Sequence, residues 1–154
     1  MTMQHDSHNK PFTFRSARPA DAPRLAELSS QLGYPATAQE IRRRLAALAR
    51  ARAQRVLVAV QGGEVVAWMH VGLRRSLEMA PCAEVVALVV DAAVRRAGIG
   101  RALLARAEAW ARARALPVIL VRSNILRGEA HAFYEALGYR RMKTQHVYQK
   151  TLCS

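Results

Sequence analysis

The first fifty residues show two different spacings of apolar side chains. Residues 12–18, FTFRSAR, alternate as a half-buried strand does, and 18–33 then follow a helical repeat that begins near Asp21 and ends near Gly33. Apolar positions four and three residues apart predict a second helix over 38–52, with arginines on its outer face. The chain therefore begins with a strand followed by two helices.

The middle of the chain is rich in β-branched residues and predicts three strands. The segments 55–60 and 64–73 flank the sequence QGG, which is typical of two strands joined by a tight hairpin. Residues 83–91, AEVVALVVD, are almost wholly apolar, as expected for a strand covered on both faces. This third strand leads directly into a turn that contains two glycines.

A long helix follows that turn. Pro117 ends its pattern, and the short strand VILVRS is predicted over 118–123. The buried face of the helix is predicted from one apolar stripe, which is formed by Ile99, Leu103, Ala107 and Trp110.

The last part of the chain combines a short helix with a final strand. Residues 128–137, GEAHAFYEAL, predict the helix, Gly138 its C-terminal stop, and the run from Tyr139 toward Lys150 the strand. Strands precede and follow helices without regular βα alternation. The predicted fold class is therefore α/β (α+β), with a central mixed sheet and helices on both faces.

Length and composition favour one globular domain. The chain has 154 residues, of which 51% are hydrophobic and 23% charged, enough to bury a single core. We expect a flexible polar tail at 1–10 and one domain over 11–154. The tail lacks the apolar run of a signal peptide, and no segment approaches the roughly 18 apolar residues of a membrane span, so a soluble cytoplasmic protein is expected. Cys82 and Cys153 lack metal-ligand spacing and are expected to be free thiols, and no metal site is expected.

The net charge of the chain is unusual. Lys plus Arg number 24 against 11 Asp plus Glu, which gives a net charge of +13 and a pI near 11.3. Such a balance attracts polyanions, whether nucleic acid, anionic lipid or a polyphosphate cofactor. A basic nucleic-acid-binding domain is therefore an alternative. It predicts aromatics interleaved with the arginines for base stacking, yet aromatic residues make up only 6% of the chain.

The turn at 95–100, RRAGIG, lies between the buried strand and the long helix. A helix N-terminus offers unpaired N–H groups and the positive end of the helix dipole, and glycine lets an anion approach the backbone closely. A P-loop would need Gly-Lys-Ser/Thr, and a dinucleotide fingerprint would need a third glycine where Leu103 stands. The turn is interpreted as a phosphate cradle of another kind; the alternative is a helix entry whose glycines only relieve local strain.

Two motifs carry a family resemblance. RRAGIG resembles the R/Q-x-x-G-x-G/A acetyl-CoA signature of the GNAT N-acetyltransferase superfamily. SNILRGEAHAFYEALGY, residues 123–139, resembles that family's later motif, in which an asparagine precedes a helix carrying FYE. The resemblance spans roughly residues 12–152. It implies the GNAT fold, whose mostly antiparallel sheet splays between its fourth and fifth strands.

The resemblance also implies a site for acetyl-CoA. Backbone amides from Arg96 to Arg101 would bind the pyrophosphate, with arginine side chains adding charge, and backbone groups of the preceding strand would pair with pantetheine. Asn124 would contact the pantetheine arm, or else serve as a cap or turn residue. The expected cofactor-binding residues are Leu88, Val89, Val90, Arg95, Arg96, Ala97, Gly98, Ile99, Gly100, Arg101 and Asn124.

Three residues are candidates for catalysis of direct amine attack on the thioester in a ternary complex. Tyr134 corresponds to the family's tyrosine general acid, which protonates the departing thiolate; the alternative is core packing with its apolar helix neighbours. Glu84 lies where some members carry a glutamate that accepts the amine proton, and the alternative is a surface charge at a strand end. His131, one turn before Tyr134, would relay a proton or form a hydrogen bond with Glu135.

The function implied by the resemblance is transfer of acetyl from acetyl-CoA to a primary amine, with small-molecule acceptors preferred over protein. NILRGEAHAFYEALGY resembles in particular the aminoalkylphosphonate N-acetyltransferases and similar small-amine members. Acceptor pockets in the family are built from the first two helices, here around Tyr34 to Arg44, and vary with substrate, so the acceptor stays open. The oligomeric state is also open, with a homodimer among the alternatives. No specific nucleic acid and no membrane partner are expected, and a GNAT fold that binds CoA without turnover is a further alternative.

Overall fold

The computed structural model describes residues 10–95, 97–123 and 128–153. The chain divides into two compact units, one ending at Arg122 and the other beginning at Ser123. The single domain expected over 11–154 stays a prediction. The tail expected at 1–10 lies outside the described residues except for Lys10.

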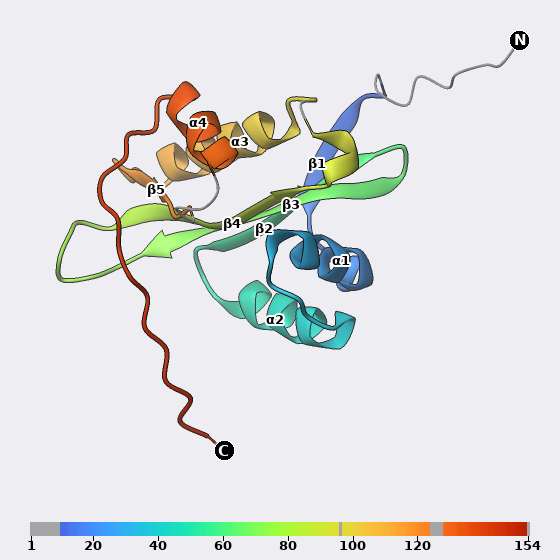
Figure 1. Cartoon of the computed structure of the whole chain (residues 1–154), viewed down its shortest axis with the longest axis horizontal. Coiled ribbons are helices and arrows are strands. Elements are labelled where there is room, and N and C mark those ends of the chain that lie inside the picture. Colours follow the sequence, from blue (N-terminus) through green and yellow to red (C-terminus); the bar gives the residue numbers. More distant parts are fainter. Residues whose placement is uncertain (1–9, 96, 124–127, 154) are drawn as a thin grey trace, which may run out of the picture. The chain divides into compact units, whose positions relative to one another are not determined.

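The first unit is built on a sheet whose described strands number five, in the order β1-β2-β3-β4-β5 (Figure 1). The strands are β1 (Phe12–Ser16), β2 (Gln54–Gln61), β3 (Glu64–Arg74), β4 (Cys82–Val90) and β5 (Ile119–Val121). Neighbours from β1 to β4 run antiparallel, whereas β4 and β5 run parallel. The mixed, mostly antiparallel sheet predicted from the sequence is confirmed.

The hairpin that joins β2 to β3 follows from its two glycines. Gly62 and Gly63 have φ angles of +58° and +80°. A two-residue turn whose twist matches that of the flanking strands needs a positive φ at both positions, and only glycine adopts it at little cost. The predicted hairpin is therefore present.

β4 is paired unevenly along its length. It pairs with β5 only over Ala83–Val85, so within the described residues its second half extends beyond its parallel partner, as the predicted splay requires. Against β3 the register shifts beside His70, which leaves Val86 as a bulge, and this side chain is 49% exposed. The expectation that both faces of this strand are covered is wrong at Val86, because a bulge turns its residue out of the ladder.

Helices cover both faces of the sheet. α1 (Ala22–Leu32) and α2 (Ala38–Arg50) lie on one face, and α3 (Ile99–Ala113) lies on the other (Figure 1). Leu25 and Leu28 of α1 form a core with sheet valines, and Ile41 and Leu45 of α2 pack against that core. The long α2 is thus held by one narrow face, while its arginine side chains are exposed.

α3 has a broader buried face than the sequence predicts. Its buried residues are Ile99, Leu103, Leu104, Ala107 and Ala111. Trp110 was expected in this stripe, but its side chain is only half-buried, and the Arg114 guanidinium lies 4.7 Å from the ring centroid. The expectation for Trp110 is wrong because one face of its indole makes a cation–π contact with a guanidinium. The smaller Ala111 occupies the buried position instead.

The beginning of α1 is fastened to β1 by an ion pair. Both carboxylate oxygens of Asp21 accept from the Arg15 guanidinium, at 2.7 and 2.9 Å, and Oδ2 also accepts from the Arg18 N–H at 2.7 Å. The Arg15 hydrogen bonds outweigh the effect of burial and hold the pKa of Asp21 below its usual value. The pair therefore stabilises the fold above about pH 4 and loses that contribution as the pH falls through the lowered pKa.

The second unit carries α4 (Gly128–Ala136), whose predicted stop, Gly138, has a φ of +89°. The strand predicted from Tyr139 toward Lys150 is absent from the described residues 139–153. That prediction is wrong. Alternating side chains favour an extended chain, but a strand forms only where a neighbouring strand accepts and donates its backbone hydrogen bonds.

His70 of β3 gives the fold a pH dependence near neutrality. Its Nε2 lies 2.6 Å from Oε1 of Gln54, and burial lowers its pKa below the usual value, because the charged ring loses solvation. The unfolded chain then binds the proton more tightly, so stability is lost as the pH falls from about 6.5 toward the folded-state pKa.

We expect urea unfolding to show a lower free energy of unfolding at about pH 5.5 than at about pH 7.5. Within this range, the difference is about 1.4 kcal/mol for each pH unit by which the pKa of His70 in the folded chain lies below its pKa in the unfolded chain. His70→Gln removes the titrating ring and flattens this difference. His146→Gln, at an exposed histidine, is the matched control and leaves the difference in place. An undiminished difference in His70→Gln would assign the pH dependence to other groups.

Candidate functional site

The turn between β4 and α3, residues 91–98, connects the end of a strand to the start of a long helix. Asp91 caps a short 3₁₀ segment, Ala92–Val94, because its Oδ1 accepts a backbone N–H two residues onward at 3.1 Å. α3 then begins at Ile99, whose side chain is 1% exposed. The turn is thus anchored at one end by a capping carboxylate and at the other by a core side chain.

Gly98 is the residue that opens this turn to a ligand. Its φ is +81°, in the left-handed region that glycine adopts without strain. A Cβ built at Gly98 would meet no described atom within 4 Å, so the space in front of this backbone is open. The first N–H groups of α3 have no acceptor within the helix and carry the positive end of its dipole. The turn therefore has the geometry of a site for a phosphate or pyrophosphate.

Cationic side chains flank the same turn. Arg95 is exposed, and its Nε donates to the carbonyl of Val90 at 3.4 Å. Arg101 is exposed in the first turn of α3, and Ala97 is exposed beside Gly98. Gly100, also in that first helical turn, is half-buried. Arg96 lies outside the described residues.

The predicted pantetheine edge lies directly before this turn. Leu88–Val90 pair with Ala67–Met69 of β3 and extend beyond β5, which pairs only as far as Val85. Alternate backbone groups on the β5 side of this stretch are therefore left without a strand partner among the described residues. The structure thus brings the strand edge and the glycine turn together, whereas Asn124 lies outside the described residues.

Glu84 lies in an ion-pair cluster that the sequence did not reveal. Its Oε1 accepts from Nε of Arg122 at 2.8 Å, and its Oε2 lies 3.5 Å from Nη1 of Arg74. The Glu84 side chain is 16% exposed. Each carboxylate oxygen can accept a second hydrogen bond, so the cluster leaves acceptor capacity on Glu84. Arg74 is the last residue of β3, and Arg122 directly follows β5. Only the strand register brings the two arginines to one carboxylate.

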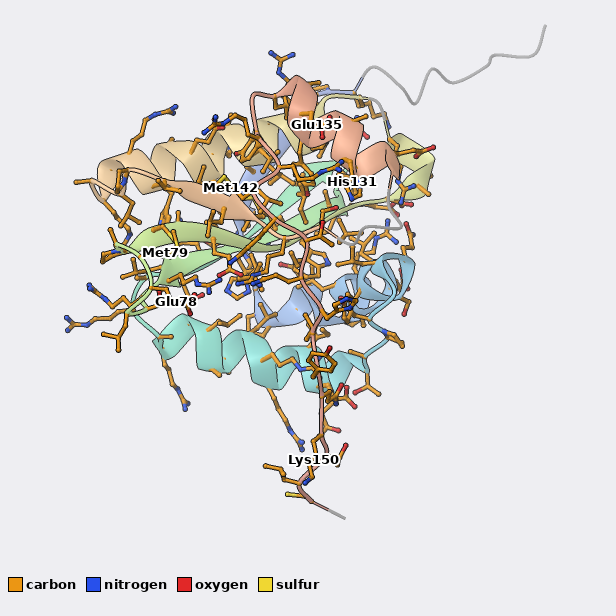
Figure 2. The ribbon with its side chains drawn as sticks, turned by 60° about the vertical axis from the view of Figure 1, so that its left-hand side comes forward. Glu78, Met79, His131, Glu135, Met142 and Lys150 are labelled. Atoms are coloured by element: carbon orange, nitrogen blue, oxygen red, sulfur yellow. The ribbon has the colours of Figure 1, made fainter. Side chains whose placement is uncertain are left out.

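The other two catalytic candidates lie on α4 in the second unit. His131 and Tyr134 are one turn apart and share a face of the helix. The Tyr134 ring contacts the Tyr139 ring edge to face, with centroids 5.9 Å apart. Figure 2 shows His131 and Glu135 on the same helix, and the Glu135 carboxylate lies 3.5 Å from Nη2 of Arg141.

In the described part of the chain, no three His, Cys, Asp or Glu side chains come close enough together to hold a metal ion. None of the described helices is long and apolar enough to cross a membrane. Cys82 is buried and Cys153 exposed, and both are free thiols as expected.

Comparison with known proteins agrees with this geometry. A model of the acetyltransferase (GNAT) family matches residues 22–139. The chain is 30% identical over 131 residues to aminoglycoside N(6′)-acetyltransferase type 1 of Stenotrophomonas maltophilia, covering 82% of this chain and 85% of that protein.

Solved structures show the same fold. The apo structure of the aminoglycoside 6′-N-acetyltransferase AAC(6′)-Ig from Acinetobacter haemolyticus has a TM-score of 0.78 at 19% identity, covering 92% of this chain and 99% of that one. The aminoglycoside N-acetyltransferase AAC(6′)-Iy in complex with CoA has a TM-score of 0.81 at 13% identity, covering 94% and 97%. The family model spans most of the sequence, including both motifs, and so this chain belongs to the GNAT family and is an acetyl-CoA-dependent N-acetyltransferase.

Proposed function

We propose that the enzyme acetylates a primary amine of a small molecule, with acetyl-CoA bound along the end of β4 and over the β4–α3 turn. The observation that carries this proposal is the left-handed, open Gly98 at the start of α3, directly after the uncovered edge of β4. Amides of Gly98–Arg101 would bind the pyrophosphate. Backbone groups of Leu88–Val90 would pair with pantetheine, and Asn124 would contact the same arm.

The proposed chemistry is direct attack in a ternary complex. The neutral amine nitrogen attacks the thioester carbonyl, the new C–N bond forms, and the C–S bond breaks. Glu84 would accept the proton that leaves the amine, directly or through a water, with His131 as the alternative acceptor. Tyr134 would donate a proton to the departing CoA thiolate. One proton is thereby accepted from the amine and one is donated to the thiolate, so the reaction is balanced.

The proposed acceptor is an aminoglycoside-like amine. The curated relative and the solved structures described above are aminoglycoside N-acetyltransferases by name. The match with the curated relative covers 82% of this chain and 85% of that protein. An aminoglycoside 6′-amine is thus the first acceptor to test.

A second acceptor class is favoured by one specific observation. If Glu84 faces the amine, Arg74 and Arg122 on its two oxygens flank the acceptor. Two guanidiniums repel a further ammonium group and attract a phosphonate or carboxylate. An aminoalkylphosphonate, which carries one amine and one anion, suits this arrangement better than a polycation does.

Release of free CoA with an acceptor panel tests these assignments. We expect turnover with an aminoglycoside bearing a 6′-amine and kcat/KM lower by at least about 10²-fold with its 6′-hydroxyl analogue, which lacks the nucleophile. Turnover of an aminoalkylphosphonate in its place would support the second class, and Arg122→Gln should then raise its KM by about tenfold. Absence of CoA release with every amine would contradict the enzymatic proposal for small molecules.

Two further expectations stay predictions. A homodimer is favoured by large apolar side chains that the described C-terminal segment exposes to solvent, and these are Met142, Val147, Tyr148 and Leu152. The second expectation that stays a prediction is the cytoplasmic location expected from the sequence.

A further inference from the structure

Two side chains of α1 reach the end of β4. Arg24 and Gln31 are seven residues apart and so share one face of the helix. Arg24 donates through Nη2 to Oδ2 of Asp91 at 2.5 Å and through Nε to the Val65 carbonyl at 2.8 Å. Gln31 donates to Oδ1 of Asp91 at 3.3 Å and accepts from the Ala92 N–H at 3.0 Å. The helix thereby contacts both β3, through Val65, and the first residues of the β4–α3 turn.

Asp91 is the centre of these contacts. Its backbone N–H donates to the Val66 carbonyl at 2.8 Å, and its Oδ1 accepts from the Ala93 N–H. Burial alone would raise the pKa of Asp91, but hydrogen bonds from Ala93, Arg24 and Gln31 outweigh it and hold the pKa below its usual value. The carboxylate is therefore ionised at neutral pH, and its contact with Arg24 is a charge-assisted hydrogen bond.

The position of Asp91 also matters for an anionic ligand. It precedes Gly98 by seven residues, and an unpaired carboxylate in the same turn would repel a pyrophosphate. Arg24 neutralises this carboxylate, with the Asp91 side chain 16% exposed and the Arg24 side chain 29% exposed. The positive end of α3 and the exposed Arg95 and Arg101 side chains then face the ligand without opposition from an unpaired Asp91 carboxylate.

Backbone amides bind an anion well only when they already point toward it, because reorienting a turn on binding costs affinity. The end of the turn at Ile99 is held by core packing. The contacts described for its beginning come from β3 and from α1. The side chains of α1 therefore complete the fixation of the turn at its beginning.

We propose that Arg24, Gln31 and Asp91, called the α1 clamp, position the β4–α3 turn so that its amides bind the acetyl-CoA pyrophosphate. The proposal rests on the proposed function, because it requires the pyrophosphate to lie at Gly98–Arg101. The clamp residues are positioning residues that act through the backbone of the turn. The sequence did not reveal this clamp, because Asp91 lies 67 residues from Arg24 and 60 residues from Gln31.

A matched pair of arginines tests this clamp. Arg24 and Arg15 are both 29% exposed, and each pairs with an aspartate in the first unit. Arg15 fastens the beginning of α1 to β1, whereas Arg24 fastens α1 to the turn. Each of the variants Arg24→Met and Arg15→Met removes an ion pair to an aspartate, and Arg24→Met also removes an exposed pair with Glu27 on α1 itself. Only Arg24→Met should alter the cofactor site.

The measurements are the dissociation constant of acetyl-CoA by calorimetry and the steady-state constants with acetyl-CoA and with S-acetylpantetheine, which carries the thioester but no pyrophosphate. Arg24→Met should weaken acetyl-CoA binding about tenfold and change kcat at saturating acetyl-CoA by less than about twofold. Its kcat/KM for S-acetylpantetheine should stay within about twofold of the wild type. Arg15→Met should lower the melting temperature and leave all of these constants unchanged.

Several outcomes would overturn the clamp. Equal losses of acetyl-CoA affinity in the two variants, or equal losses of kcat/KM with the two acyl donors, would show a purely structural role. If Arg24→Met does not fold, Gln31→Leu should show the same selective loss at about threefold, and unchanged affinity in that variant is equally contradictory. Unchanged affinity in Gly98→Val would instead refute the proposed pyrophosphate site, so the two failures are distinguishable.

Discussion

Tyr134→Phe should lower kcat by about 10²-fold to 10⁴-fold, the usual contribution of general acid catalysis, while the dissociation constant of acetyl-CoA changes by less than about twofold. The substitution removes the phenolic O–H and keeps the ring, whose edge-to-face contact with Tyr139 has centroids 5.9 Å apart. The departing thiolate then lacks its proton donor. Single-turnover measurements at saturating substrates separate this chemical step from product release.

Tyr139→Phe is the matched control, because it removes a hydroxyl from the ring in contact with Tyr134 and leaves the helix intact. Its kcat should stay within about twofold of the wild type. Intact turnover in Tyr134→Phe would show that Tyr134 packs without donating a proton. An equal loss in both variants would show that the aromatic contact, and not one hydroxyl, supports the rate.

Features set by local rules were predictable from the sequence. Gly33 ends α1 with a φ of +95°, Gly62 and Gly63 form the hairpin turn, and Gly98 stands before the first turn of α3. Each needs only the conformational freedom of glycine and the periodicity of its neighbours. Such features need no information about distant parts of the chain.

Features that depend on pairing or packing were not predictable in the same way. Val86 is turned out by a register shift between two strands, and the half-buried Trp110 depends on a cation that stacks on it. The strand expected from Tyr139 toward Lys150 needed a hydrogen-bonding neighbour that the described residues do not provide. In each case the amino-acid pattern was compatible with the prediction, and a distant contact decided the outcome.

The same distinction between local rules and distant contacts holds for the candidate site. The glycine turn could be identified from its motif, because the motif residues are contiguous and their backbone does the binding. The partners of Glu84 are 10 and 38 residues away, and Arg24 is 67 residues from Asp91. No spacing rule relates residues so far apart, so these charged contacts emerge only once the strand register and the packing of α1 are known.

Gly98→Val should abolish most of the acetyl-CoA-dependent rise in melting temperature. A ligand that binds only the folded state stabilises it by RT ln(1 + [L]/Kd), which is about 2.7 kcal/mol when the ligand concentration is 100 times Kd. Valine at a φ of +81° is strained, and its side chain would project into the open space in front of the turn. Both effects act against a pyrophosphate that must approach these amides.

Strain and ligand exclusion can be separated, because the chain has a second glycine of the same geometry. Gly63 has a φ of +80°, and a Cβ built there also meets no described atom within 4 Å. Gly63→Val should therefore lower the melting temperature of the free protein about as much as Gly98→Val does, and it should keep the full rise with acetyl-CoA. If Gly98→Val also keeps that rise, the turn does not hold the pyrophosphate. If both variants lose it equally, strain alone explains the loss, and only a selective loss at Gly98 assigns the open space to the ligand.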